Sequence, residues 1–364
     1  MHKIANKDIR LDFLDGLRGW GALSVLLYHT FVQGFPITEK VSVELYRFFL
    51  FNGPLAVWIF FIVSGFSLSI KYFQFGDIAS LRRIALGRYI RLMIPILAVG
   101  IIVFILFKLS IIPAASERPS AFQAFLAVPP TLHDALRFGL FDVFFKYDAS
   151  KSLSPPLWTM AYELWGSAMV IGTLFVAGKS PYRFALYLAI GVLALLVHVF
   201  YINFIIGIVF ADVYSGGLRH RYANLWKYLP GAALVAGLIA SAFLRRESSD
   251  FHFLASAALI SLGVIFDKHA ARAISSKLSR FLGRISFPLY LIHSTVFFSY
   301  SLWVFGIWGS TAESSFEVKI LLNISTVLVA ILAAIALTPA DTFSVWLSKK
   351  FAAVFVRKPS PDQR

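Results

Sequence analysis

Long apolar runs, separated by short segments rich in lysine and arginine, constrain this chain more than any other feature. A helix that crosses a bilayer needs about 20 consecutive apolar residues, and a soluble domain of this length would carry roughly a quarter charged residues. Here 58% of the residues are apolar and only 15% are charged. The pattern predicts an all-α polytopic membrane protein with about ten transmembrane helices, at residues 17–35, 48–70, 92–112, 157–177, 184–200, 201–213, 229–244, 253–266, 287–306 and 318–338.

The basic residues predict an orientation. With the N-terminus inside, most of the 34 lysines and arginines fall on the inner side of the spans, and the positive-inside rule then places both termini in the cytoplasm. The same distribution accounts for the net charge of +15, so we expect no nucleic acid among the partners. We expect residues 1–350 to form one transmembrane domain and 351–364 a short cytoplasmic tail, with the first span retained rather than cleaved.

The residue types exclude some kinds of site. The chain has no cysteine, which excludes disulfides, thiolate nucleophiles and cysteine-ligated metals. Its eight histidines are dispersed and form no H-E-x-x-H pair, so no metal site is predicted. The longest connection, 113–156, is predicted to lie outside, and its apolar side chains predict a short amphipathic helix on the outer surface.

The first span carries two charged or titratable residues, Arg18 and His29. Eleven residues separate them, so they share one helix face about 16 Å apart, and Asp15 precedes Arg18 by one turn. Ionisable residues inside spans are costly and mark functional sites by default. Two simpler readings stay open: Arg18 sets topology and snorkels to the headgroups, and His29 is a neutral core histidine. The shared face argues against both readings together.

Glu163 lies about six residues inside the outer end of the fourth span. His29 lies at a similar distance from its own outer end, so we expect the two at one depth. A buried carboxylate beside a histidine can fix its tautomer, stabilise its cation or act as the base itself. The alternative is that Glu163 only pairs with a structural arginine.

Further polar residues flank the second, third and ninth spans. The loop from Arg82 to Arg91 holds four arginines, which positive-inside topology alone would explain, although guanidinium groups also bind phosphates bidentately. Ser64-Gly65 supplies small groups where helices or an acyl chain can approach closely. His293 is predicted near the cytoplasmic side, too far from His29 to share a proton, with a cavity-lining and a packing role equally open.

Five motifs in this order resemble those of the acyltransferase 3 family of integral membrane acyltransferases, over essentially the whole chain. They are Leu11-Asp12-Phe13-Leu14-Asp15-Gly16-Leu17-Arg18-Gly19 with His29, then Phe60-Phe61-Ile62-Val63-Ser64-Gly65-Phe66, then Arg82 to Pro95, then Pro156-Leu157-Trp158-Thr159-Met160-Ala161-Tyr162-Glu163, and last Gly283 to His293. The resemblance implies acyl transfer from cytoplasmic acyl-CoA, usually acetyl-CoA, to a hydroxyl of a carbohydrate or other acceptor. Nodulation-factor and exopolysaccharide O-acetyltransferases of this family do this in the inner membrane of bacteria.

The resulting hypothesis is a helical bundle with a cavity that crosses the bilayer. Catalytic roles are assigned to His29, as general base or acyl-imidazole nucleophile, and to Glu163, which orients or charges His29 or binds the acceptor. The sequence leaves direct and covalent transfer open. Acyl-CoA is a co-substrate, with no permanently bound cofactor. The two remaining sets are the predicted CoA-binding residues, Arg18, Arg83, Arg88, Arg91 and His293, and the cavity-shaping residues, Asp15, Ser64, Gly65, Trp158 and Tyr290.

Two other classes of protein compete with this hypothesis. A transporter or flippase of a glycan or lipid-linked sugar would share the topology and the intramembrane charges. It would more often show inverted repeats with paired broken helices, which this sequence lacks. A structural subunit would give no reason for Arg18, His29 and Glu163 to lie within the spans.

Overall fold

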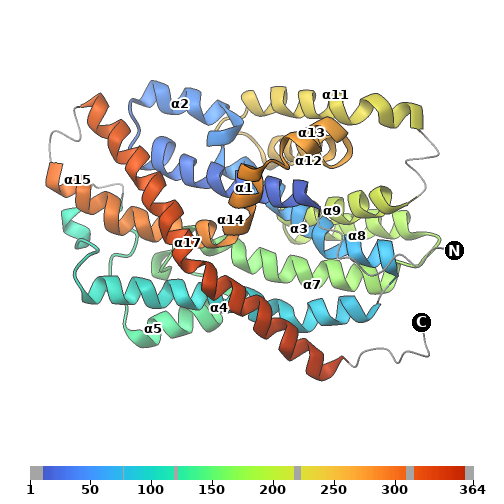
Figure 1. The fold of residues 1–364 in the computed structure, drawn as a ribbon, viewed down its shortest axis with the longest axis horizontal. Helices are drawn as coiled ribbons and strands as arrows, with labels where there is room; N and C mark the ends of the chain where they lie inside the picture. The colour runs from blue at the N-terminus through green and yellow to red at the C-terminus, as the bar shows by residue number, and fades with distance from the viewer. Residues whose placement is uncertain (1–10, 77, 119–121, 217–222, 309–314, 357–364) are drawn as a thin grey trace.

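The computed structural model describes residues 11–76, 78–118, 122–216, 223–308 and 315–356, and these ranges contain helices and no strand. Most long helices run side by side, while α17 crosses the bundle diagonally (Figure 1). The first half comprises α1 (Asp12–Leu27), η1 (Tyr28–Gly34), α2 (Glu39–Arg47), η2 (Phe49–Phe51), α3 (Gly53–Phe75), α4 (Ile78–Lys108), η3 (Ala115–Glu117), α5 (Leu132–Arg137), η5 (Phe138–Asp142), α6 (Val143–Phe145), η6 (Ala149–Lys151), η7 (Pro155–Trp158) and α7 (Thr159–Ala177). The second half comprises α8 (Arg183–Val197), α9 (Phe200–Ser215), α11 (Ala223–Ala242), α12 (Asp250–Phe266), α13 (Lys268–Ala273), α14 (Lys277–Val296), η8 (Phe297–Ser301), α15 (Leu302–Trp308) and α17 (Phe316–Phe355).

The all-α membrane class is confirmed by the length and apolar character of the helices. Within the described ranges, six helical segments are long and apolar enough to cross a membrane: Gly53–Phe75, Ile78–Lys108, Pro155–Ala177, Asn224–Ala242, Lys277–Trp308 and Phe316–Phe355. The shorter apolar helices α8, α9 and α12 coincide with three more predicted spans, and α1 with η1 coincides with the first. The count of ten and the cytoplasmic termini stay predictions.

Three predicted helix boundaries were wrong because a helix need not end where its hydropathy falls. Helix α4 begins at Ile78, so the arginines between residues 82 and 91 lie on a helix and not in a loop. Helix α14 begins at Lys277, ten residues earlier than predicted, where the Ser276 hydroxyl accepts a hydrogen bond from the Ser279 N–H. Helix α17 continues through Phe355, so the first residues of the predicted tail are helical. Residues 357–364 lie outside the described ranges.

The helix predicted in the long connection exists but does not lie across the outer surface. Residues 132–145 are helical and pack lengthwise against α4. Gly139 lies against Leu97, where an added Cβ would come within 2.7 Å of the Leu97 Cα. The Tyr89 hydroxyl donates to the Leu140 carbonyl. Small residues allow this close helix packing in membrane proteins, and the segment therefore runs alongside α4 at the edge of the bundle (Figure 1).

Candidate functional site

Helices α1 and α14 run parallel and in register, which brings two distant histidines together. At the crossing, a Cβ on Gly19 would lie 2.5 Å from the Gly283 nitrogen, so only glycine permits this approach. His29 and His293 each lie ten residues beyond their glycine, about 15 Å along the helix. Their rings stack with centroids 5.1 Å apart. His293 was predicted to lie near the cytoplasmic side, far from His29. This prediction was wrong because α14 starts earlier than predicted.

His29 lies in the π-helical turn η1, a departure from α-helix that often marks functional sites. Its Nδ1 is 2.7 Å from Gln33 Oε1. Because an amide oxygen can only accept, Nδ1 carries the hydrogen and Nε2 keeps its lone pair. Gln33 thus makes the contact with His29 that the sequence predicted for Glu163. The sequence held one signal for this contact: Gln33 is a polar residue four positions after His29, and side chains at this spacing are neighbours on a helix.

The ring of His293 is oriented by its own helix. Its Nδ1 donates to the Tyr290 carbonyl at 2.8 Å, which leaves Nε2 as the acceptor nitrogen. The side chain is 1% exposed, and Nε2 has no hydrogen-bond partner among the described residues. His293 therefore contributes a stacked neighbour to His29 and does not line either cavity described below.

Two cavities lie next to each other in the bundle, and both include residues of α3 and α14 in their linings. The first, which we call the histidine cavity, has a volume of about 640 Å³. It is lined by Val25, Tyr28, His29, Gln33, Gly53, Pro54, Val57, Trp58, Phe122, Phe125, Tyr147, Ala149, Pro155, Pro156, Trp158, Phe200, Tyr290, Ser294, Phe297 and Phe298. Several of these residues belong to the long connection, which was predicted to lie outside.

The second cavity, which we call the arginine cavity, has a volume of about 380 Å³. It is lined by Asp15, Arg18, Val57, Phe60, Phe61, Ser64, Arg88, Arg91, Leu92, Thr159, Met160, Glu163, Gly283, Arg284, Ser286, Phe287, Tyr290 and Asp341. The structure thus gathers Arg18, Arg88 and Arg91 at one site, as predicted. Arg83 is not among the described residues that line it.

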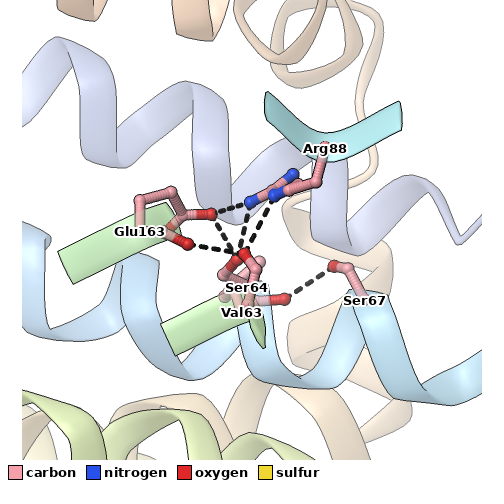
Figure 2. A network of polar contacts seen from close by, with 6 residues as sticks. Val63, Ser64, Ser67, Arg88 and Glu163 are labelled. Carbon is pink, nitrogen blue, oxygen red and sulfur yellow. Dashed lines mark hydrogen bonds and ion pairs between the residues drawn. The ribbon is translucent and has the colours of Figure 1, made fainter. Parts of the chain in front are cut away.

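Glu163 belongs to the arginine cavity, where it pairs with Arg88 (Figure 2). The Ser64 hydroxyl donates to Glu163 Oε1 at 2.5 Å, and Arg88 Nε donates to the Ser167 hydroxyl at 2.9 Å. Within the described ranges, Glu163 forms no hydrogen bond to His29. The expected Glu163–His29 contact was therefore wrong, and the alternative, a carboxylate paired with an arginine, matches the observed geometry.

The other arginines of this cavity differ in how they are engaged. Arg91 forms an ion pair with Asp341 at 2.6 Å and donates to the Ser344 hydroxyl at 2.9 Å. Arg18 and Arg284 line the same cavity, and Glu163 and Asp15 lie close enough to Arg18 to interact with it electrostatically. Both guanidinium groups are placed where they could contact an anionic ligand. Arg284 was not singled out as a site residue, although it lies within the fifth motif.

Val57 and Tyr290 line both cavities and form the wall between them. The Tyr290 hydroxyl is 2.7 Å from Thr159 Oγ1 and 2.8 Å from the Pro156 carbonyl, so η7 and α7 hold this side chain in place. Trp158 lines the histidine cavity, and its ring packs against Phe200 at 5.3 Å between centroids.

Gly65 serves helix packing and not a cavity. A Cβ there would lie 2.3 Å from the Phe204 carbonyl oxygen, so α3 and α9 touch at this point. Of the two roles that the sequence left open for Ser64-Gly65, helix approach therefore applies to Gly65. Ser64, on the adjacent face, lines the arginine cavity.

The acyltransferase domain model of the acyltransferase 3 family matches residues 11–340. The chain belongs to this family. Comparisons with curated proteins and with solved structures found no match. Family membership makes the protein a multi-pass membrane acyltransferase of the non-aminoacyl type, and it decides against the transporter alternative. The charged cavity and the histidine-bearing cavity, which share one wall, are the candidate site of this acyltransferase.

Proposed function

We propose that the protein transfers an acyl group, in the simplest case acetyl, from cytoplasmic acyl-CoA to a hydroxyl of a cell-surface or lipid-linked carbohydrate. The observation that carries the proposal is the pair of cavities that share Val57 and Tyr290. One is rich in arginine and the other contains an imidazole with a free nitrogen. Donor and acceptor would enter from opposite ends and react near the common wall.

The arginine cavity suits the phosphate-bearing donor. Guanidinium groups bind phosphate oxygens with paired hydrogen bonds, and Arg18 and Arg284 line this cavity and offer such donors. Arg88 and Arg91 are held by Glu163 and Asp341, so they would add positive potential from fixed positions. In this proposal Glu163 is a positioning residue for Arg88.

His29 supplies the chemistry in the histidine cavity. Its Nε2 would accept the proton of the acceptor hydroxyl as that oxygen attacks the thioester carbonyl. The C–S bond then breaks, the new ester forms, and the imidazolium returns its proton to the CoA thiolate. In the covalent alternative, Nε2 itself attacks the thioester carbonyl, the C–S bond breaks, and CoA leaves as the thiol with the proton of the imidazole, so that a neutral acyl-imidazole forms. The acceptor hydroxyl then attacks this acyl group, the N–acyl bond breaks, the ester forms, and the hydroxyl proton returns to the imidazole. Mass spectrometry of acid-quenched protein without acceptor separates the two routes.

The orientation and location belong to the same proposal. The arginine cavity would face the cytoplasm, where acyl-CoA is made, and the histidine cavity would face outward toward surface glycans. The positive-inside distribution supports this orientation. A bacterial inner membrane and an exopolysaccharide or nodulation-factor type of acceptor are the corresponding proposals for location and substrate.

Radiolabel transfer tests the proposal. Membranes with matched amounts of wild type or His29→Ala receive labelled acetyl-CoA, and the label in surface polysaccharide is counted. We expect transfer by wild type and loss of at least about 100-fold in His29→Ala, the lower end of the range for one general base. Binding of acetyl-CoA should be unchanged because His29 does not line the arginine cavity. Equal transfer by both proteins would remove His29 from the mechanism.

A further inference from the structure

We propose that the group acylated in the histidine cavity is uncharged, namely a neutral sugar residue and not a uronic acid, a sialic acid or a phosphorylated sugar. The inference rests on the proposed function, in which a carbohydrate hydroxyl is the acceptor. It adds the class of carbohydrate, which neither the family nor the reaction specifies.

The two cavities differ sharply in charge. Of the 20 described residues that line the histidine cavity, none is aspartate, glutamate, lysine or arginine, and ten are phenylalanine, tyrosine or tryptophan. The arginine cavity has seven charged side chains among 18. Both cavities lie in the same bundle, so the difference belongs to the sites and not to the membrane environment as a whole.

This lining favours a neutral ring. Aromatic faces pack against the C–H faces of a sugar, while Gln33, Ser294 and the Tyr147 hydroxyl offer a few hydrogen bonds. Burial raises the pKa of Tyr147, so its hydroxyl stays uncharged. A carboxylate or phosphate would lose hydration here without a cation to replace it, which is costly.

Two arginines close to the lining are already engaged by backbone carbonyls. Arg118 lies 5.9 Å from the Phe298 ring but is 4% exposed, and it donates to the carbonyls of Pro113, Phe125 and Leu126. Arg246 donates to the Val32 carbonyl at 3.2 Å and lines a separate surface hollow beyond the histidine cavity. Neither guanidinium is directed at a ligand beside His29.

Matched acceptors test the inference. The purified protein in lipid nanodiscs receives labelled acetyl-CoA and pairs of methyl glycosides, glucoside with glucuronoside and galactoside with galacturonoside. The members of each pair differ in a CH₂OH or a carboxylate on the same ring. We expect kcat/KM at least about tenfold higher for the neutral member, from the cost of placing an unpaired charge in this lining.

Ala149→Lys provides a second measurement, with Ala149→Gln as its control of similar length. Ala149 lines the histidine cavity and is exposed, so neither variant should disturb folding. The lysine variant should lower the ratio of kcat/KM for the neutral acceptor to kcat/KM for the acidic acceptor. The glutamine variant should leave this ratio unchanged. Equal use of both members by wild type would overturn the inference while leaving the proposed function intact. Transfer to no sugar of either series would overturn the carbohydrate acceptor itself.

Discussion

Replacement of Gln33 tests whether this side chain holds His29 in its reactive form. In Gln33→Leu the imidazole loses the acceptor that lies 2.7 Å from Nδ1. The ring can then rotate or adopt the other tautomer, with the hydrogen on Nε2. Because Gln33 does not carry substrate charge, we expect a fall in kcat with little change in the KM for acyl-CoA.

The magnitude follows from the single hydrogen bond that is lost. A hydrogen bond of this type contributes about 0.5–1.5 kcal/mol net, and 1.36 kcal/mol corresponds to a factor of ten in rate. Gln33 is exposed, so water can partly replace it, and we expect a loss of about 3–10-fold. Gln33→Glu keeps an acceptor oxygen at the same reach and should retain most activity, within about threefold of wild type.

The assay is initial-rate acetyl transfer in nanodiscs over a range of both substrates. Phe31→Leu serves as a control within the same π-helical turn, because Phe31 packs against Phe51 and lines neither cavity among the described residues. Wild-type kcat in Gln33→Leu would refute the assignment. An equal loss in Gln33→Leu and Gln33→Glu would show that the residue acts through packing and not through its oxygen.

Two further predictions concern packing and the Arg88 pair. Gly65→Ala places a Cβ 2.3 Å from the Phe204 carbonyl oxygen and should destabilise the protein by about 1–3 kcal/mol. The measurement is the Tm in detergent, which should fall. Gly172→Ala is the control, because its added Cβ would meet open space and should leave the Tm unchanged. Glu163→Gln should destabilise by up to about 3 kcal/mol because Arg88 loses its counter-charge, and adding Arg88→Gln should restore part of the Tm. A stable but inactive Glu163→Gln protein would instead give Glu163 a chemical role.

The spans and the arginine cluster could be predicted because each depends on local patterns. Apolar runs report burial in lipid, and eleven residues of helix fix the relation of Arg18 to His29 whatever surrounds them. Arg18, Arg88 and Arg91 line one cavity as expected, because the positive-inside pattern assigned all three to the same side of the spans. The depth of a side chain in the membrane was predicted from its distance to the end of its span. That estimate held only where the predicted end of the span was correct.

Partners across helices could not be predicted from a single sequence. The His29–His293 stack depends on the register of α1 against α14, which the Gly19–Gly283 contact sets. The partner of Glu163 depends on which neighbouring helix faces this side chain. A predicted depth in the membrane could not show whether that partner is His29 or Arg88. Gln33 was overlooked because a neutral amide carries no desolvation signal as strong as that of a charged residue.

The intramembrane carboxylates explain how this bundle tolerates so many arginines. The arginine cavity contains four arginines and three carboxylates, and two of the carboxylates pair with Arg88 and Arg91. Pairing lowers the cost of burying charge and leaves a small positive excess. That excess would favour a phosphate-bearing donor in this cavity. The described lining of the histidine cavity contains no lysine or arginine that could bind a phosphate. The difference in charge across the Tyr290 wall would therefore keep donor and acceptor apart until the thioester reaches His29.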